Sequence, residues 1–194
     1  MTRRIALIQG HPDPAGGHFG HALADAYAAG AERAGHEVRR VEVAQLDFPL
    51  LRSQADFETG TPVADIAAAQ EAIDWAEHLV IVYPLWLGTM PALLKGFLEQ
   101  VFRPGFAFSY ETEGWPKKKL KGRSARVVVT MGMPAFAYRW IFLAHSLRSL
   151  ERNILRFVGI APVRDTIVRM VEALKPEQRD RWLRRMGALG ERAR

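Results

Sequence analysis

Two stretches of the chain combine residue types that suit ligand binding, and the first is glycine-rich. It runs from Gly10 to His21 (GHPDPAGGHFGH) and contains four glycines. Glycines let backbone N–H groups approach a ligand closely, and a helix that begins at Gly20 would add the positive end of its dipole. This combination is typical of a phosphate-binding loop. Neither GxxxxGK[ST] nor GxGxxG occurs here, which excludes a Walker loop and a dinucleotide fingerprint.

Other interpretations of the same loop remain open. His11, Asp13, His18 and His21 are residue types that bind zinc or iron. The remaining histidines have no ligand-like neighbours in sequence, so we expect no metal site. An ordinary glycine- and proline-rich turn is the other alternative. A phosphate beside His11 and His18 is the most economical role for the loop.

The second stretch, from Tyr83 to Phe102, predicts a site for a flat apolar ligand. An apolar strand runs directly into Pro84 and an uncharged turn that contains Trp86. Pro91 then suits the first turn of an amphipathic helix. Exposed apolar side chains in a loop are costly unless something covers them, and a ring-shaped ligand is the simplest cover.

Alternating strands and helices must position these two loops. Strands are expected at residues 5–8, 38–43, 79–83, 125–130 and 163–168, and helices at 20–34, 63–76, 91–101, 138–157 and 176–189. This alternation predicts an α/β fold in which helices cover both faces of a five-stranded parallel sheet. The doubly wound order 2-1-3-4-5 fits five strands and has its switch point between strands 1 and 3. The two ligand loops follow those two strands.

Composition limits the class of protein. The 194 residues are 48% hydrophobic and 25% charged, which predicts a single domain over residues 1–194. No apolar run approaches the roughly 18–20 residues that span a bilayer, and the N-terminus does not resemble a signal peptide. The chain has no cysteine, which excludes disulfides, thiolate metal sites and cysteine catalysis. We expect a cytoplasmic location.

The net charge of +6 is concentrated partly in a basic block, defined as Lys117, Lys118, Lys119, Lys121 and Arg123. A solvated basic surface explains this block, and attraction to an anion is the alternative. The anion could be a phosphorylated cofactor, an acidic membrane surface or a nucleic acid. No nucleic-acid-binding motif accompanies the charge, so no nucleic-acid partner is expected.

Three segments together resemble the NAD(P)H:quinone oxidoreductase family, the DT-diaphorase-like branch of the flavodoxin-fold enzymes. They are the His11…His18-Phe19-Gly20 loop, the Tyr83-Pro-Leu…Pro91-Ala-Leu-Leu-Lys-Gly-Phe block, and Thr130-Met-Gly-Met133. The resemblance covers nearly the whole chain. It implies a flavodoxin-like three-layer sandwich and a bound flavin, with FMN favoured over FAD. It also implies hydride transfer from NAD(P)H and two-electron reduction of quinones or similar flat acceptors.

The resemblance also assigns roles by position. It implies that the flavin phosphate is surrounded by His11, His18, Phe19 and Gly20. It implies that the ring lies along Pro84, Leu85, Trp86, Leu87 and Gly88, with Thr130, Met131, Gly132 and Met133 at its opposite side. His18, Gly20, Met131 and Met133 depart from the family's usual residues.

Further roles concern catalysis and the acceptor. By the resemblance, Tyr138 and His145 are the active-site tyrosine and histidine, and their i, i+7 spacing places both on one helical face. Such donors stabilise the negative charge that hydride arrival leaves on the ring, and histidine passes protons near neutral pH. Phe106, Phe108 and Tyr110 alternate along an extended segment that, in the family, caps the pocket, often from the partner subunit.

The resulting hypothesis is a flavin-dependent NAD(P)H oxidoreductase with ping-pong kinetics, and a homodimer is expected from the resemblance. Two other classes remain. One is an ancillary flavoprotein that docks on a membrane potassium-efflux transporter through the basic block. The other is a flavodoxin-type carrier of single electrons, which the net charge of +6 argues against.

Overall fold

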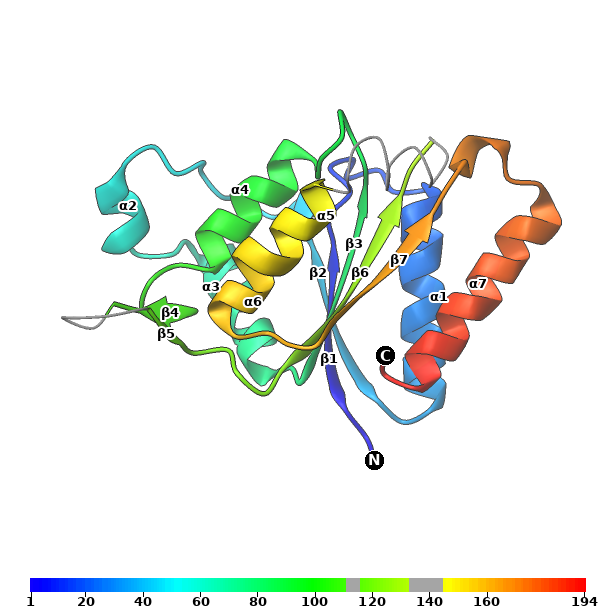
Figure 1. The fold of residues 1–194 in the computed structure, drawn as a ribbon, viewed down its shortest axis with the longest axis horizontal. Helices are drawn as coiled ribbons and strands as arrows, with labels where there is room; N and C mark the ends of the chain where they lie inside the picture. Colours follow the sequence, from blue (N-terminus) through cyan, green and yellow to red (C-terminus); the bar gives the residue numbers. More distant parts are fainter. Residues whose placement is uncertain (111–115, 133–144) are drawn as a thin grey trace.

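The central sheet has five parallel strands in the order β2-β1-β3-β6-β7 (Figure 1). The computed structural model describes residues 1–110, 116–132 and 145–194. The strands are β1 (Arg4–Gln9), β2 (Glu37–Glu42), β3 (His78–Pro84), β6 (Ser124–Thr130) and β7 (Val163–Val168). The three central strands are almost wholly buried, because continuous apolar runs suit strands that are covered on both faces. The order confirms the predicted 2-1-3-4-5 arrangement.

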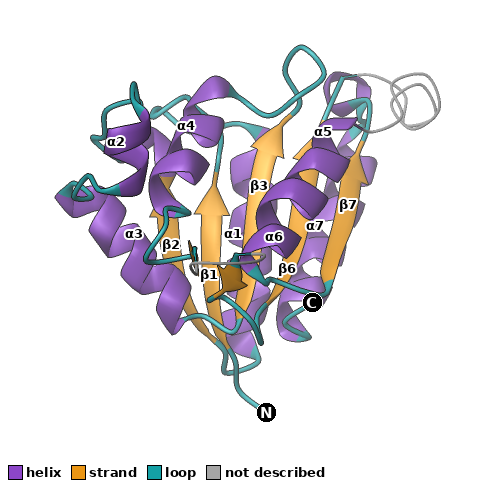
Figure 2. Ribbon diagram, turned by 60° about the vertical axis from the view of Figure 1, so that its left-hand side comes forward, coloured by secondary structure: helices purple, strands orange, loops and turns teal. Residues whose placement is uncertain are grey.

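Helices cover the sheet on both faces and make three layers (Figures 1 and 2). α1 and α7 lie on one face, and α3, α4 and the α5–α6 segment lie on the other. Their bounds are α1 (Phe19–Arg33), α2 (Gln54–Glu58), α3 (Ala64–Trp75), α4 (Ala92–Val101), α5 (His145–Ser149), α6 (Arg156–Val158) and α7 (Pro176–Glu191). Two short 3₁₀ turns are η1 (Val43–Gln45) and η4 (Val171–Ala173).

α1 and α7 pack with their backbones unusually close. A Cβ atom added to Gly30 would lie 2.1 Å from the carbonyl oxygen of Gly187, and one added to Gly190 would lie 2.0 Å from that of Tyr27. Residues with a side chain cannot occupy these two positions without moving a helix. The close contact fixes α1, whose N-terminus faces the glycine-rich loop.

Most expected helix bounds agree with the structure to within two residues. Gly35 has φ +80°, as expected for a left-handed residue after α1. Pro91 is the N-cap of α4, one position before the expected first turn. The expected helix 138–157 lies partly outside the described residues. Its described part, 145–157, contains the π-helix η3 (Leu150–Leu155), which the sequence did not predict.

Two features of the connections were also not predicted. The loop after β2 contains the short helix α2, whose N-cap Ser53 accepts a hydrogen bond from the Asp56 N–H at 3.1 Å. The segment after α4 contains a small antiparallel pair, β4 (Phe108–Ser109) with β5 (Lys117–Lys118). In the described part of the chain, no helix is both long and apolar enough to cross a membrane.

Candidate functional site

The glycine-rich loop begins tightly against the sheet. The Gly10 N–H donates to the Val82 carbonyl at 2.7 Å, so β1 and β3 stay joined one residue past the end of β1. A Cβ at Gly10 would lie 2.7 Å from Leu94 Cδ2 of α4, so a side chain at this position would require movement of Leu94. The start of the loop is therefore held by both the sheet and α4.

His11 is a buried, neutral histidine with a defined tautomer. The backbone N–H of His11 donates to Gln9 Oε1 at 3.1 Å, and the backbone N–H of Asp13 donates to the His11 ring Nδ1 at 3.1 Å. Accepting at Nδ1 leaves the proton of the neutral ring on Nε2. Burial is the main cause that lowers the pKa of His11 to about 4, and the nearby His18 and His21 contribute to the same shift.

Three imidazole rings gather at the N-terminus of α1. His11 stacks on His18 with ring centroids 3.9 Å apart, and His21 lies 5.2 Å from His11. His18 Nε2 is 2.7 Å from Asp13 Oδ2, and the same hydrogen bond lowers the pKa of Asp13. Within the described residues, no group of these side chains is arranged to hold a metal ion. Phe19 and Gly20, the first residues of α1, follow immediately.

The loop after β3 forms a tight hairpin that presents apolar side chains. Trp86 and Thr89 exchange backbone hydrogen bonds of 2.8 and 2.9 Å, and Leu87 and Gly88 at the tip have φ values of +47° and +80°. Positive φ at both central residues is typical of a type I′ turn. The Trp86 side chain is 50% exposed and Leu87 is fully exposed. The N–H groups of Leu87 and Gly88 lie outside the hairpin's own pair of bonds.

The two loops meet. The His11 ring contacts the edge of the Trp86 indole with centroids 5.9 Å apart. This contact bridges the ends of β1 and β3, which are neighbours at the switch point of the sheet. Ligands of open α/β sheets bind at that place. The structure thus brings together the loop suited to phosphate and the loop suited to a flat ring.

The end of β6 adjoins the same edge. The Leu85 N–H donates to the Thr130 carbonyl at 2.8 Å, which places Pro84 and Leu85 directly beside β6. Thr130 and Met131 are buried and Gly132 is exposed. The Met131 N–H donates to the Val168 carbonyl at 2.9 Å. Met133 and Tyr138, two predicted site residues, lie outside the described residues.

His145 begins α5 beside the hairpin. The next residue, Ser146, is buried and donates its hydroxyl to Thr89 Oγ1 at 3.1 Å. This bond joins the beginning of the described part of α5 to the last residue of the hairpin. His145, the residue before Ser146, is exposed, and its predicted catalytic role stays a prediction.

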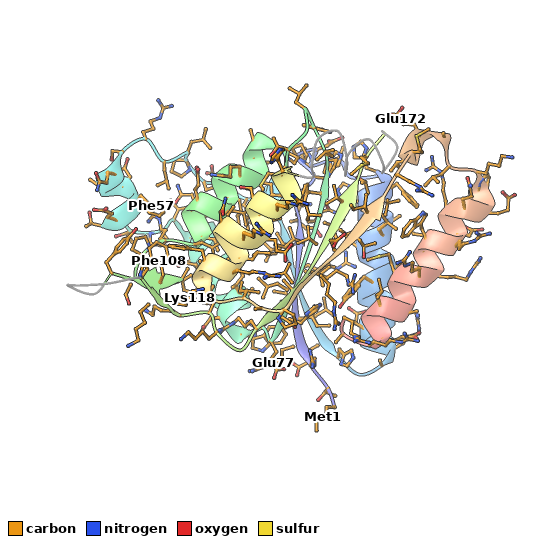
Figure 3. The ribbon with its side chains drawn as sticks, viewed as in Figure 1. Met1, Phe57, Glu77, Phe108, Lys118 and Glu172 are labelled. Carbon is orange, nitrogen blue, oxygen red and sulfur yellow. The ribbon has the colours of Figure 1, made fainter. Side chains whose placement is uncertain are left out.

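Phe106, Phe108 and Tyr110 are not brought to this edge within one copy of the chain. Phe108 is buried between Phe57 and Phe157, with ring centroids at 6.4 and 5.0 Å. Figure 3 shows Phe108 and Phe57 on the flank of the molecule, away from Glu172 at the carboxyl ends of the strands. Phe106 is half-buried on the same flank, and Tyr110 is 63% exposed. Their predicted capping role stays a prediction.

Sequence reasoning missed two residues of the site. Gln9 is only 2% exposed; its Oε1 accepts from His11 while its Nε2 is buried without a partner in the described structure. A glutamine that ends an apolar strand is the signal that could have identified it. Ser146 was missed because its partner, Thr89, is 57 residues away in sequence.

The basic block is largely engaged within the fold. Lys118 Nζ donates to the Arg156 carbonyl at 2.7 Å, and Lys119 Nζ donates to the Gly105 carbonyl. Arg123 donates to the backbone and the carboxylate of Asp74 at 2.6 and 2.8 Å. These side chains join the segment after α4 to α6 and to the end of α3. The structural explanation of the block is therefore the stronger one.

A cavity of about 530 Å³ lies at the opposite end of the sheet, near the start of β1 and β3. Its lining includes Arg3, His78 and Arg164. Burial lowers the pKa of His78 to about 3, helped by the charge of Arg126. None of the loops that follow the carboxyl ends of β1, β3 or β6 contributes to this lining, so the cavity is separate from the candidate site.

The fold defines a flavodoxin-type α/β protein, and the paired loops form its candidate ligand site at the switch point. A family described as having a flavodoxin-like fold matches residues 3–189. The chain therefore belongs to this flavodoxin-like family.

Individual relatives support the resemblance to quinone oxidoreductases. The chain is 30% identical over 142 residues to the FMN-dependent NADH:quinone oxidoreductase 2 of Listeria innocua, covering 68% of this chain and 66% of that protein. It is 26% identical over 155 residues to the ribosyldihydronicotinamide dehydrogenase-like protein traD of Penicillium crustosum, covering 66% of this chain and 57% of that protein. The chain thus spans less than two thirds of each of these relatives.

A solved structure shows the same fold over the full length. The NAD(P)H:quinone oxidoreductase of Methanothermobacter marburgensis superimposes with a TM-score of 0.81 at 24% identity, covering 100% of both chains. At this identity the superposition confirms the predicted fold, and the sequence relatives confirm the predicted resemblance.

Proposed function

We propose that this chain is a flavin-dependent NAD(P)H oxidoreductase that reduces quinones or similar flat acceptors by two electrons. The observation that carries the proposal is the 5.9 Å contact between the His11 and Trp86 rings. It joins a loop suited to phosphate to a hairpin suited to a flat ring. Flavin mononucleotide carries both groups on one molecule.

The described residues fit such a group. No side chain caps the N-terminus of α1, and its first two N–H groups, of Phe19 and Gly20, have no intrahelical acceptor; with the helix dipole they favour a phosphate. Gln9 Nε2 is a buried donor without a described partner beside the same loop. Trp86 and Leu87 expose apolar surface that a flat ring would cover, and the Leu87 and Gly88 N–H groups are available to its polar edge.

Each part of the site then has a role. The residues that would hold the phosphate are His11, His18, Phe19 and Gly20. Those that would lie along the ring are Pro84, Leu85, Trp86, Leu87 and Gly88, with Thr130, Met131, Gly132 and Met133 at the opposite edge. FMN is proposed over FAD because the Listeria innocua relative is named FMN-dependent.

A bound flavin supplies hydride acceptance from reduced nicotinamide and two-electron transfer to an acceptor. The chain would position the flavin ring and exclude water from it, because the exposed Trp86 and Leu87 side chains offer an apolar surface for the ring. By the family resemblance, His145 would pass a proton and Tyr138 would be the active-site tyrosine that stabilises the developing negative charge. Reduced nicotinamide and the acceptor would occupy the same place beside the ring, one after the other. Ping-pong kinetics follow, because the first product must leave before the second substrate binds.

A second copy of the chain would complete the slot. Tyr110 is exposed on the flank and packs edge-on against Phe108 at 5.3 Å, so a dimer could present it, together with the neighbouring Phe106, to the partner's hairpin. We propose this homodimer and a cytoplasmic location. Light scattering that gives a monomeric mass would contradict the dimer.

Reconstitution with FMN tests the function. We expect the purified protein to bind FMN, shown by a visible absorbance band that stays with the protein after gel filtration. It should then oxidise NADH or NADPH when a benzoquinone is added, with parallel double-reciprocal lines. Failure to bind any flavin, or no quinone-dependent oxidation by the loaded protein, would overturn the proposal.

A variant of the hairpin tests the observation itself. Trp86→Ala removes a flat partner whose stacking on a heterocycle contributes about 1–3 kcal/mol, so FMN should bind roughly tenfold more weakly. Val63→Ala, a partly exposed apolar residue before α3, is the control and should leave FMN affinity unchanged. Equal FMN affinity of the Trp86→Ala variant and the unaltered protein would contradict the assignment.

A further inference from the structure

The loop assigned to the phosphate carries no permanent positive charge. No lysine or arginine occurs between Arg4 and Arg33, a span that includes the loop and almost all of α1. The loop after β3 is also free of them, from Leu79 to Leu94. A terminal phosphate carries a charge of about −1.5 to −2 at neutral pH. A helix N-terminus supplies only about half a positive charge, so the phosphate charge is not balanced by fixed groups of these two loops.

Three imidazole rings, and no lysine or arginine of the loop, lie at the N-terminus of α1. His18 is the N-cap of α1 and His21 lies in its first turn. Their ring centroids are 5.7 Å apart, and each lies within 5.2 Å of the His11 ring. His11 is buried and its Nδ1 already accepts the Asp13 N–H, so it remains neutral. By contrast, His18 is exposed and His21 is half-buried.

Other charged groups around these rings are few. Asp13 faces His18 at 2.7 Å. Glu42, at the end of β2, interacts electrostatically with His21, and burial is the main cause that raises the pKa of Glu42. The Arg40 guanidinium lies 4.0 Å from the Glu42 carboxylate. From α7, Arg179 lies over the Phe19 ring at 5.2 Å. Its guanidinium is engaged with the Val171 and Leu174 carbonyls at 3.1 and 3.2 Å.

We propose that His18 and His21 recognise the flavin phosphate by taking up protons from solvent as it binds. This inference rests on the proposed flavin site and adds how the site distinguishes a phosphorylated flavin from riboflavin. Each imidazole that gains a proton becomes a cation beside the phosphate oxygens, and the negative phosphate in turn stabilises that cation. Asp13 holds the His18 ring in place at the mouth of the loop.

Proton-linked binding has a measurable signature. Histidine ordinarily titrates near pH 6.5, and one proton gained on binding changes affinity by up to about tenfold per pH unit. The FMN dissociation constant should therefore rise roughly tenfold between about pH 6.5 and 8.5. Riboflavin, which shares the ring but lacks the phosphate, should change less than about twofold.

Flavin fluorescence titrations over this pH range test the proposal without any turnover assay. Calorimetry of FMN binding to the unaltered protein in two buffers of different ionisation enthalpy should show uptake of about one proton at pH 7.5. The His18→Gln/His21→Gln protein should bind FMN with little pH dependence and bind riboflavin as before. His36→Gln is the matched control; that ring accepts the Arg3 N–H at 3.0 Å, at the amino ends of the strands.

The outcomes separate the two proposals. If FMN binds with no pH dependence beyond that of riboflavin, or with no proton uptake, the proton-linked mechanism is wrong while the flavin site stands. If neither FMN nor riboflavin binds, the proposed function fails and this inference fails with it. If the double variant loses riboflavin binding as well, it no longer tests the phosphate contact alone. The proposal is then tested by proton uptake in the unaltered protein and by the single His21→Gln variant. No proton uptake, or an unchanged pH dependence of FMN binding in His21→Gln, would contradict it.

Discussion

The glycine contact between α1 and α7 leads to a sharp prediction about stability. A methyl group at position 190 would lie 2.0 Å from the Tyr27 carbonyl oxygen and 2.9 Å from the Ala31 nitrogen, all of it backbone that cannot rotate away. Gly190→Ala must therefore push the two helices apart. Gly187, one turn earlier, is the matched control, because its nearest neighbours would be Arg33 Nη2 at 3.4 Å and the Ala26 carbonyl at 3.5 Å.

The magnitude follows from two opposing effects. Overpacking a close contact costs about 1–3 kcal/mol and sometimes more, and here the clash is between backbones. Replacing glycine by alanine within a helix returns about 0.5–1 kcal/mol. Because the clash is at the severe end of the range, we expect Gly190→Ala to lower the free energy of unfolding by about 2 kcal/mol, or about 4–8 °C in Tm for a chain of this size. Gly187→Ala should be neutral or slightly stabilising.

Urea unfolding followed by far-UV circular dichroism measures both variants. A shift of the midpoint at constant slope would show that stability, and not the unfolded state, has changed. Because α1 begins at the candidate phosphate site, Gly190→Ala should also weaken FMN binding, whereas Gly187→Ala should not. Equal unfolding midpoints for the two variants would refute the reasoning from close backbone contact.

Two further predictions concern buried basic groups. Arg103 is buried and donates to the Gly60 and Asp56 carbonyls at 2.6 and 2.7 Å, so Arg103→Leu should cost about 2–4 kcal/mol in urea unfolding. An unchanged midpoint would contradict this. The pKa of His78 is lowered to about 3, so the unfolded chain gains a proton near pH 6.5 that the folded chain does not. Stability should therefore fall as pH drops below about 6.5, by about 1.4 kcal/mol per pH unit from this group. His78→Gln should reduce that slope, and equal slopes would contradict the assignment.

The strand order could be predicted because β1, β3 and β6 are continuous apolar runs. Such runs are typical of strands covered on both faces, and few arrangements of five such strands obey right-handed crossovers. The β4–β5 pair could not be predicted, since β5 consists of two exposed lysines, Lys117 and Lys118. The π-helix η3 was missed because one extra residue per turn leaves no clear mark on an amphipathic pattern.

The two ligand loops of the site were predicted because each is a local pattern: glycines before a helix, and a proline and tryptophan after a strand. Contacts between segments could not be predicted in the same way. The Ser146–Thr89 bond and the His11–Trp86 contact depend on how the chain folds back on itself. Gln9 was overlooked because a polar residue after an apolar run indicates that the strand has ended, whereas the structure buries Gln9.

The engagement of the basic block has a practical consequence. Three side chains of the block donate hydrogen bonds to backbone carbonyls of other segments: Lys118, Lys119 and Arg123. Replacing them by neutral residues would loosen the segment after α4 as well as lower the charge. If such a variant lost binding to a partner, the loss could come from a change in the fold or from a lost contact with the partner. Any acetylation or charge reversal of these residues must therefore be accompanied by a measurement of folding.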